Sequence, residues 1–204
     1  MSEREPDPEQ SDLVQEKVWD VPTRLLKWGL VAAVSTAWVL GDNRSFETID
    51  WHFYAGYTVG TLVVLRIVWG LFGAPSAWLS ALFPSPIAVI GYLREMGRPE
   101  PTGWRGHAPV GAMGSLVLLL LLLATVATGL FSEDDGLFAQ GPLAGLVSQT
   151  VRAELTALHH LMGRLVLAAV LLHLAAVAFY FVWKREDLLS PMISGWKSVR
   201  RRND

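Results

Sequence analysis

The chain has 204 residues, enough for one domain and little more. Hydrophobic residues make up 51% of it, it contains nine tryptophans, and its mean hydropathy is +0.34, which together predict an integral membrane protein. Cysteine is absent, and this excludes disulfides, iron–sulfur clusters, zinc–thiolate sites, thiolate-ligated haem and covalently attached c-type haem. The net charge of −2 indicates little by itself, and we expect no nucleic-acid partner.

The chain divides into three parts by composition. Residues 1–17 are acidic and lack the basic and apolar regions of a signal peptide, so we expect a disordered cytoplasmic tail. Residues 18–188 form the transmembrane part, and residues 189–204 form a basic cytoplasmic tail. Within the transmembrane part four apolar stretches are long enough to span a bilayer. They run over about 21–40, 51–72, 109–131 and 155–183. The predicted fold class is all-α, an integral membrane four-helix bundle.

The distribution of basic residues predicts the orientation of this bundle. Lysine and arginine gather before the first span, between the second and third spans, and after the fourth span. The other two loops contain only Arg44 and Arg152. By the positive-inside rule both termini lie in the cytoplasm, and the expected location is the inner membrane of a bacterium. The middle loop, residues 73–106, is amphipathic and is expected to lie at the cytoplasmic interface with membrane lipid.

Two histidines in the fourth span point to a redox cofactor. His159 and His173 are fourteen residues apart, so both lie on roughly the same side of a helix. The helical rise separates them by about 21 Å, most of the way across a bilayer core of about 30 Å. Imidazole is a common iron ligand, and a histidine at membrane depth indicates function. The pair therefore suggests two cofactors at two depths of the membrane.

Other residues fall at the same two depths on neighbouring spans. His52 begins the second span and matches the periplasmic depth of His159, as ligation by two imidazoles requires. Lys27 on the first span matches the cytoplasmic depth of His173, and it is a lysine where a second imidazole would be expected. His160 points about 100° away from His159 and is interpreted as a polar neighbour.

Five segments carry a family pattern: VWDVPTRLLKW, HFYAGYTVGTLVVLRIVWGLFGA, GHAPVGAMG, TGLFSEDDGLFAQGPLAGLVS and LHHLMGRLVLAAVLLH. Together they resemble the prokaryotic cytochrome b561 family, which includes di-haem membrane cytochromes and is related to the b-type subunit of nickel–iron hydrogenases. The resemblance covers Val18 to Ser194. It implies His52 and His159 as ligands of a periplasmic haem b, and His173 as one ligand of a cytoplasmic haem b. The remaining family ligand is the histidine of an R-x-x-H-W motif, where this chain has Lys27.

Three interpretations of Lys27 are open. In the first, the neutral amine of Lys27 ligates iron. Deprotonation of the amine from a pKa of about 10.4 costs on the order of 4–5 kcal/mol at pH 7. Alternatively, His173 holds a five-coordinate haem, and Lys27 stays charged and meets a propionate, an anionic substrate or lipid headgroups. In the third interpretation the protein has a single haem. His107, at the start of the third span, is a weaker candidate for the missing ligand.

Two arginines fall inside the predicted spans, where a charge usually faces a partner. Arg66 follows His52 by fourteen residues, and we expect it near the cytoplasmic haem, paired with a propionate. Arg164 lies one turn below His160 and is a similar candidate for the periplasmic haem, with snorkelling to the interface as the alternative.

The predicted function is electron transport across the inner membrane through two non-covalent haems b. Electrons would link a quinone or quinol pool of a respiratory chain, or a small oxidant such as superoxide, to a periplasmic or membrane redox protein. Two alternatives are open: an enzyme proper, acting as a quinol or superoxide oxidoreductase, and a haem-bearing anchor subunit of a hydrogenase or dehydrogenase. No general acid–base constellation argues for the enzyme, and quinone sites need little protein signature.

Overall fold

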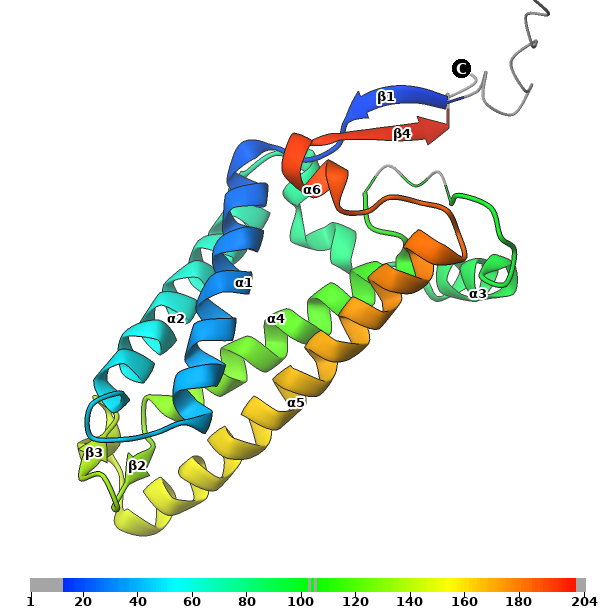
Figure 1. Ribbon diagram of the computed structural model, residues 1–204. Coiled ribbons are helices and arrows are strands. Elements are labelled where there is room, and N and C mark those ends of the chain that lie inside the picture. The colour runs from blue at the N-terminus through cyan, green and yellow to red at the C-terminus, as the bar shows by residue number, and fades with distance from the viewer. Residues whose placement is uncertain (1–12, 103, 105, 201–204) are drawn as a thin grey trace, which may run out of the picture.

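Four long helices dominate the computed structural model, which describes residues 13–102, 104 and 106–200. They run alternately in opposite directions (Figure 1), and each is long and apolar enough to cross a membrane. The predicted fold class, a membrane four-helix bundle, is confirmed, and its orientation stays a prediction. The four helices are α1 (Val21–Asp42), α2 (Ile49–Phe72), α4 (Pro109–Gly129) and α5 (Gln149–Val182).

The helix bounds lie close to the predicted ones except at the start of α5. This helix begins at Gln149, about six residues before the predicted start. The hydroxyl of Ser148 accepts a hydrogen bond from the backbone N–H of Val151 at 3.4 Å and so caps the first turn. The first turns of α5 are polar, so hydropathy alone does not mark them as part of the span.

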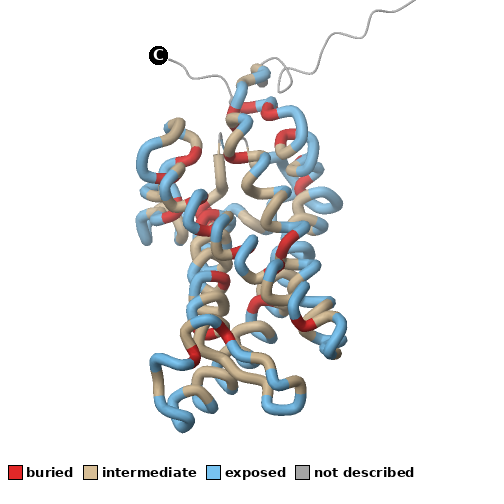
Figure 2. The backbone as a smooth tube through the Cα atoms, turned by 90° about the vertical axis from the view of Figure 1, so that its left-hand side faces the viewer, coloured by how far each residue is buried: buried red, intermediate tan, exposed pale blue. Residues whose placement is uncertain are grey.

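The helices associate as two pairs, α1 with α2 and α4 with α5, and the pairs meet through α2 and α4. Figure 2 shows that buried positions are few along the four long helices. At Gly60 of α2 an added Cβ would lie 3.0 Å from Val126 of α4, so glycine permits this close approach. The outer faces are apolar and exposed, as lipid requires. The core comprises Ala33, Val59, Val63, Leu122 and Val166.

The first and last described segments of the chain meet at one end of the bundle, here called the terminal end. Strand β1 (Leu13–Lys17) pairs antiparallel with β4 (Trp196–Arg200), and the short helix α6 (Ser190–Ser194) precedes β4 (Figure 1). Gly195 takes the left-handed conformation, φ 89°, that turns the chain from α6 into β4. Parts of both predicted tails are therefore ordered: residues 13–17 are a strand, and residues 190–200 contain a helix and a strand. Residues 1–12 and 201–204 lie outside the described residues.

The loop from α2 to α4 has helical structure of its own. Two short 3-10 helices, η1 (Pro75–Ala77) and η2 (Leu79–Leu82), lead into α3 (Pro86–Glu95). The axis bends by 98° between η1–η2 and α3, so this segment does not form a straight fifth span. Apolar side chains on α3 remain exposed, Ile87 at 83%, which agrees with the predicted interfacial position.

The opposite end of the bundle, here called the hairpin end, carries the two-residue strands β2 (Glu133–Asp134) and β3 (Ala139–Gln140), followed by the 3-10 helix η3 (Ala144–Leu146). The hairpin is fixed to α5, because the Thr156 hydroxyl accepts from the backbone N–H of Glu133 at 3.0 Å. This contact sets the position of Asp134 beside the first turns of α5.

Candidate cofactor site

His52 and His159 face each other at the hairpin end, from the first turn of α2 and from α5. Their ring centroids are 6.1 Å apart and the planes are inclined by 81°. A metal–imidazole bond is about 2.0–2.1 Å long, so two imidazoles this close together could both hold one metal ion. The structure thus brings together the two histidines predicted to share a depth.

Both imidazoles are oriented by the same kind of hydrogen bond. Nδ1 of His52 lies 2.9 Å from the backbone oxygen of Ala37 on α1, and Nδ1 of His159 lies 2.9 Å from that of Thr125 on α4. A carbonyl only accepts, so each Nδ1 carries the proton and donates. Each Nε2 therefore keeps its lone pair for a metal, the arrangement in which a carbonyl partner fixes a ligand imidazole's tautomer and ring orientation.

A glycine from the neighbouring helix lies against each of these rings. A Cβ added to Gly41 of α1 would come 2.9 Å from Cε1 of His52. A Cβ added to Gly129 of α4 would come 2.9 Å from Cε1 of His159. Both distances are well below the carbon–carbon contact of about 3.5–4.0 Å. Only glycine leaves room for the imidazoles where they stand.

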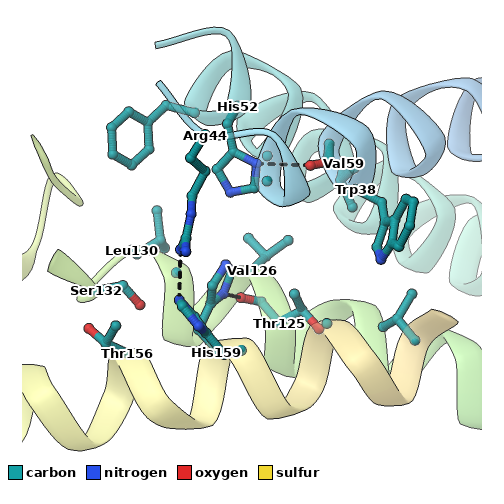
Figure 3. Close-up of a pocket in the computed structure, with 18 of the residues that line it drawn as sticks. Trp38, Arg44, His52, Val59, Thr125, Val126, Leu130, Ser132, Thr156 and His159 are labelled. Atoms are coloured by element: carbon teal, nitrogen blue, oxygen red, sulfur yellow. Dashed lines mark hydrogen bonds between the residues drawn. The ribbon is translucent and has the colours of Figure 1, made fainter. Parts of the chain in front are cut away.

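The two histidines line a cavity of about 380 Å³ between the helix pairs (Figure 3), within the range of about 300–1,000 Å³ for cofactor pockets. Gly56 and Gly163 follow His52 and His159 by four residues and line the same cavity, and a Cβ at either would meet nothing within 4 Å. The space beside each histidine is thus open along its own helix. These features fit a planar macrocycle such as haem, which His52 and His159 would hold. The apolar wall includes Val34, Val59, Leu122, Val126 and Val166.

Lys27, the residue at the remaining ligand position, lies near the terminal end of α1 in a different setting. Its Nζ lies 3.5 Å from the centroid of the Trp19 ring and 3.4 Å from Sδ of Met192 on α6. The indole of Trp28 donates to the backbone oxygen of Met192 at 3.2 Å, and Arg24 donates to that of Ile193. The R-x-x-K-W motif therefore holds α6 against the start of α1.

The other predicted residues of this end, Arg66, His107 and His173, each lie close enough to Lys27 for their charges to interact. His173 is exposed on α5, and its ring makes no hydrogen bond within the described part of the chain. Arg66 is buried, and it donates from Nη1 to the backbone oxygen of Ala77 at 2.9 Å, so a loop carbonyl partners its charge. His107 packs edge-on against Trp19, with ring centroids 4.8 Å apart.

His107 lies in the loop before α4, outside the spans. Burial lowers the pKa of its imidazole to about 3, and the nearby positive charges of Lys27 and Arg66 act in the same direction. The ring is therefore neutral at pH 7.

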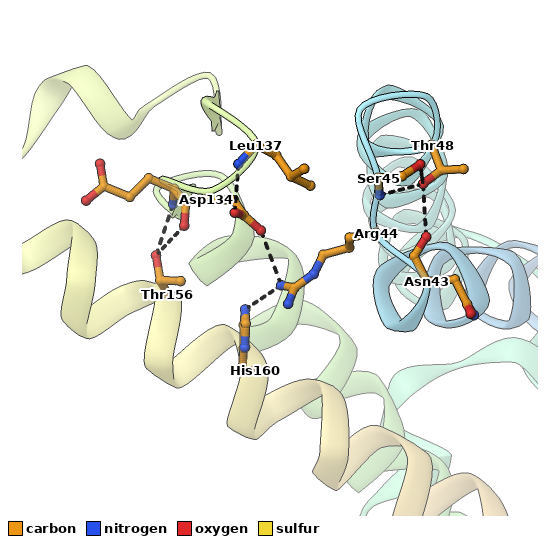
Figure 4. Close-up of polar contacts among 9 residues, drawn as sticks. Asn43, Arg44, Ser45, Thr48, Asp134, Leu137, Thr156 and His160 are labelled. Atoms are coloured by element: carbon orange, nitrogen blue, oxygen red, sulfur yellow. Dashed lines mark hydrogen bonds and ion pairs between the residues drawn. The ribbon is translucent and has the colours of Figure 1, made fainter.

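Sequence reasoning missed one residue that reaches this cavity. Arg44 lies in the α1–α2 loop, and the sequence analysis used it only as one of the basic residues that predict orientation. In the structure it lines the cavity together with His160 and Arg164. Its Nη1 lies 3.1 Å from Nε2 of His160 and 3.6 Å from an oxygen of Asp134 (Figure 4). No spacing rule connects a loop residue to α5, so the sequence held no signal for this contact.

Comparison with known proteins identifies the family. The model of a family described as prokaryotic cytochrome b561 matches residues 18–195, most of the chain. The chain belongs to the prokaryotic cytochrome b561 family. The resemblance expected from the five sequence segments is thereby confirmed. As a b-type cytochrome of this family, the protein has haem b as its implied cofactor, and the cavity between His52 and His159 has the residues to hold it.

Curated relatives of this b561 protein carry hydrogenase names. A protein of Rhizobium leguminosarum bv. viciae named "Probable Ni/Fe-hydrogenase B-type cytochrome subunit" is 25% identical over 171 residues, covering 75% of this chain and 70% of the relative. Proteins of the same name from Rhodobacter capsulatus and Bradyrhizobium diazoefficiens are 27% and 24% identical, covering 73% and 90% of this chain and 62% and 86% of those relatives. No solved structure matches the chain significantly.

Proposed function

We propose that this cytochrome transfers electrons across a bacterial inner membrane through two haems b. His52 and His159 would hold the first haem. The second would take His173 as one ligand, with Lys27 at the remaining family position. The single observation that carries the proposal is the His52–His159 pair, with centroids 6.1 Å apart and each Nδ1 at a backbone oxygen. Haem supplies the one-electron chemistry, and the protein supplies ligation, burial and charge.

Passage across the membrane follows from the two depths of the histidines. His159 and His173 are fourteen residues apart on α5, a helical rise of about 21 Å. Basic residues flank the terminal end, and this supports a cytoplasmic position for that end and for His173. The first haem would then lie towards the periplasm, so that electrons move along α5 between the two faces.

The donor and the acceptor would come from two chemical classes. A quinone or quinol dissolved in the membrane, or a small oxidant such as superoxide, would exchange electrons at one haem. A redox protein would exchange them at the other, and the names of the relatives support a partner in a hydrogenase-like complex. The relatives also support a second candidate, a membrane anchor subunit, which co-purification with a dehydrogenase or hydrogenase would distinguish.

The contacts of Lys27 bear on the second haem. The Lys27 amine lies over the face of the Trp19 ring, where a protonated amine would make a cation–π contact. Ligation of iron would require Lys27 to lose its proton and leave Trp19 and Met192. We therefore propose that Lys27 stays charged beside a haem on His173, the second of the three interpretations.

Haem quantification with EPR spectroscopy tests the proposal on the wild type and on Lys27→His. We expect the wild type to bind two haems, only one of them low-spin with two histidine ligands, and Lys27→His to convert the other to the same class. One haem per chain would contradict the second site. Two identical bis-histidine signals in the wild type would contradict the assignment of Lys27. A purified, haem-replete protein that exchanges electrons with no quinone, superoxide or redox partner would contradict the function itself.

A further inference from the structure

The cavity between His52 and His159 has few cationic side chains to meet an anionic ligand. Haem b carries two propionate carboxylates, and a carboxylate at the edge of an apolar pocket needs a cationic partner. Among the described residues that line the cavity, only Arg44 and Arg164 are permanently charged cations. Acidic residues line the same end, Asp134 among them, and they would repel a propionate unless a cation lies between.

The backbone on both sides of Arg44 is held by its own loop (Figure 4). The Thr48 hydroxyl donates to the backbone oxygen of Asn43 at 3.0 Å and accepts from the backbone N–H of Ser45 at 3.0 Å. The Asn43 side chain donates to the backbone oxygen of Val39 at 2.9 Å. These bonds fix the residues immediately before and after Arg44, so its side chain starts from a defined point.

The guanidinium of Arg44 crosses from the α1–α2 pair to the α4–α5 side. Both of its recorded contacts, to His160 at 3.1 Å and to Asp134 at 3.6 Å, use the same nitrogen, Nη1. Within the described residues Nη2 and Nε make no hydrogen bond, which leaves three N–H donors of the five that arginine carries. The free donors form one side of the planar fork that binds a carboxylate through two parallel hydrogen bonds.

We propose that Arg44 binds a propionate of the haem held by His52 and His159, while its Nη1 contacts to His160 and Asp134 keep the guanidinium at the rim of the cavity. The inference rests on the proposed haem site and adds a positioning residue to it. A fixed positive charge beside the haem favours the reduced state, so Arg44 raises the reduction potential of this haem.

Arg152 provides a matched control. Its Nη1 pairs with Glu133 at 3.0 Å, so both arginines are bound to acids of the same strand β2 at the same end of the bundle. Arg152 does not line the cavity. Arg44→Gln and Arg152→Gln therefore remove the same charge and the same class of ion pair, and differ in access to the haem.

The experiment measures two properties of the purified holoprotein: the midpoint potential of the bis-histidine haem, and the rate at which that haem passes to an excess of an acceptor apoprotein. We expect Arg44→Gln to lower the potential and speed haem loss several-fold, and Arg152→Gln to leave both near the wild type. Arg44→Lys, which keeps the charge but lacks the fork, should hold the potential and still lose haem faster.

Three results would overturn this role for Arg44. Equal shifts in Arg44→Gln and Arg152→Gln would mean that only distant charge matters. Wild-type potential and haem retention in Arg44→Gln would mean that no propionate binds there. Haem loss in Arg44→Lys at the wild-type rate would mean that the fork is not used. If the proposed haem site itself is wrong, the wild type will show no bis-histidine EPR signal. This result differs from all three results above, so a failure of the haem site can be distinguished from a failure of the Arg44 role.

Discussion

The glycine behind each histidine leads to a sharp prediction, because two effects of a glycine-to-alanine change oppose each other. In Gly129→Ala the new methyl would lie 2.9 Å from Cε1 and 3.0 Å from Nδ1 of His159. Carbon atoms pack at about 3.5–4.0 Å, so the imidazole must retreat by about 0.6 Å or more. Metal–ligand distances tolerate about 0.2 Å. The ring therefore cannot keep both its place and its iron.

The magnitude follows from the hydrogen bond that orients the ring. Nδ1 of His159 lies 2.9 Å from the backbone oxygen of Thr125, and a retreat of about 0.6 Å ends that bond. The loss is about 0.5–1.5 kcal/mol, or about 2- to 13-fold in haem affinity. Strain at the iron adds to it. The same substitution makes the helix backbone more stable by no more than about 1 kcal/mol.

Gly114→Ala on the same helix is the control, because a Cβ at Gly114 meets nothing within 4 Å. The assay combines haem titration with EPR of the bound haem, and thermal unfolding followed by circular dichroism. We expect Gly129→Ala to bind haem more weakly with an altered low-spin signal, and Gly114→Ala to bind it as the wild type does. Wild-type affinity and an unchanged signal in Gly129→Ala would refute the reasoning.

Further predictions concern the histidines and the terminal end. In EPR spectra, His52→Leu should abolish the bis-histidine low-spin signal, whereas His160→Leu should retain it. Loss of the signal in both variants would contradict the assignment of His52 as the ligand. The buried carboxylate of Glu186 pairs with Lys197 at 2.8 Å, so Glu186→Gln leaves the buried Lys197 cation without a countercharge, with the backbone oxygen of Trp104 as its partner at 2.9 Å. This change should lower the free energy of unfolding by about 3 kcal/mol. Asp187→Asn, on an exposed neighbour, is the control in the same thermal melts, and an equal effect of both would contradict this account. Burial by itself would raise the pKa of Glu186, but the hydrogen bond and charge of Lys197 hold that pKa below its ordinary value. The stabilisation by this pair is therefore complete above an ordinary pKa of about 4.3 and disappears as the pH falls through the lowered pKa of the folded state, which melts recorded across that range will detect.

The depth of each candidate site residue along its own helix was predictable from the sequence. Spacing along α5 separates His159 from His173, and the alternation of spans predicts His52 at the depth of His159. The structure places the ring centroids of His52 and His159 6.1 Å apart. Arg66 shows the limit of such reasoning. Its depth was predictable, but its hydrogen bond goes to the backbone oxygen of Ala77, in a loop whose path no periodicity describes.

The terminal end was the least predictable part of the fold. Leu13 pairs with Arg200 across nearly the whole length of the chain. Both strands are five residues long and polar, and they lie in the two segments that the sequence analysis assigned to tails. A two-stranded sheet of this size is only marginally stable alone, so it depends on the small core of Val18, Trp19 and Val199 that the fold assembles beneath it. No pattern within either segment of the sequence predicts that core.

The amino-acid sequence by itself determined the four spans, the family and the levels of the histidines, because hydropathy and the helical repeat act within a single segment. Only the tertiary structure decided what surrounds each ligand position. Gly41 and Gly129 stand behind the imidazoles, Arg44 reaches the cavity rim, and Met192 meets Lys27. Each of these contacts joins segments far apart in the chain, and their distances depend on how the helix pairs pack rather than on any spacing within one helix.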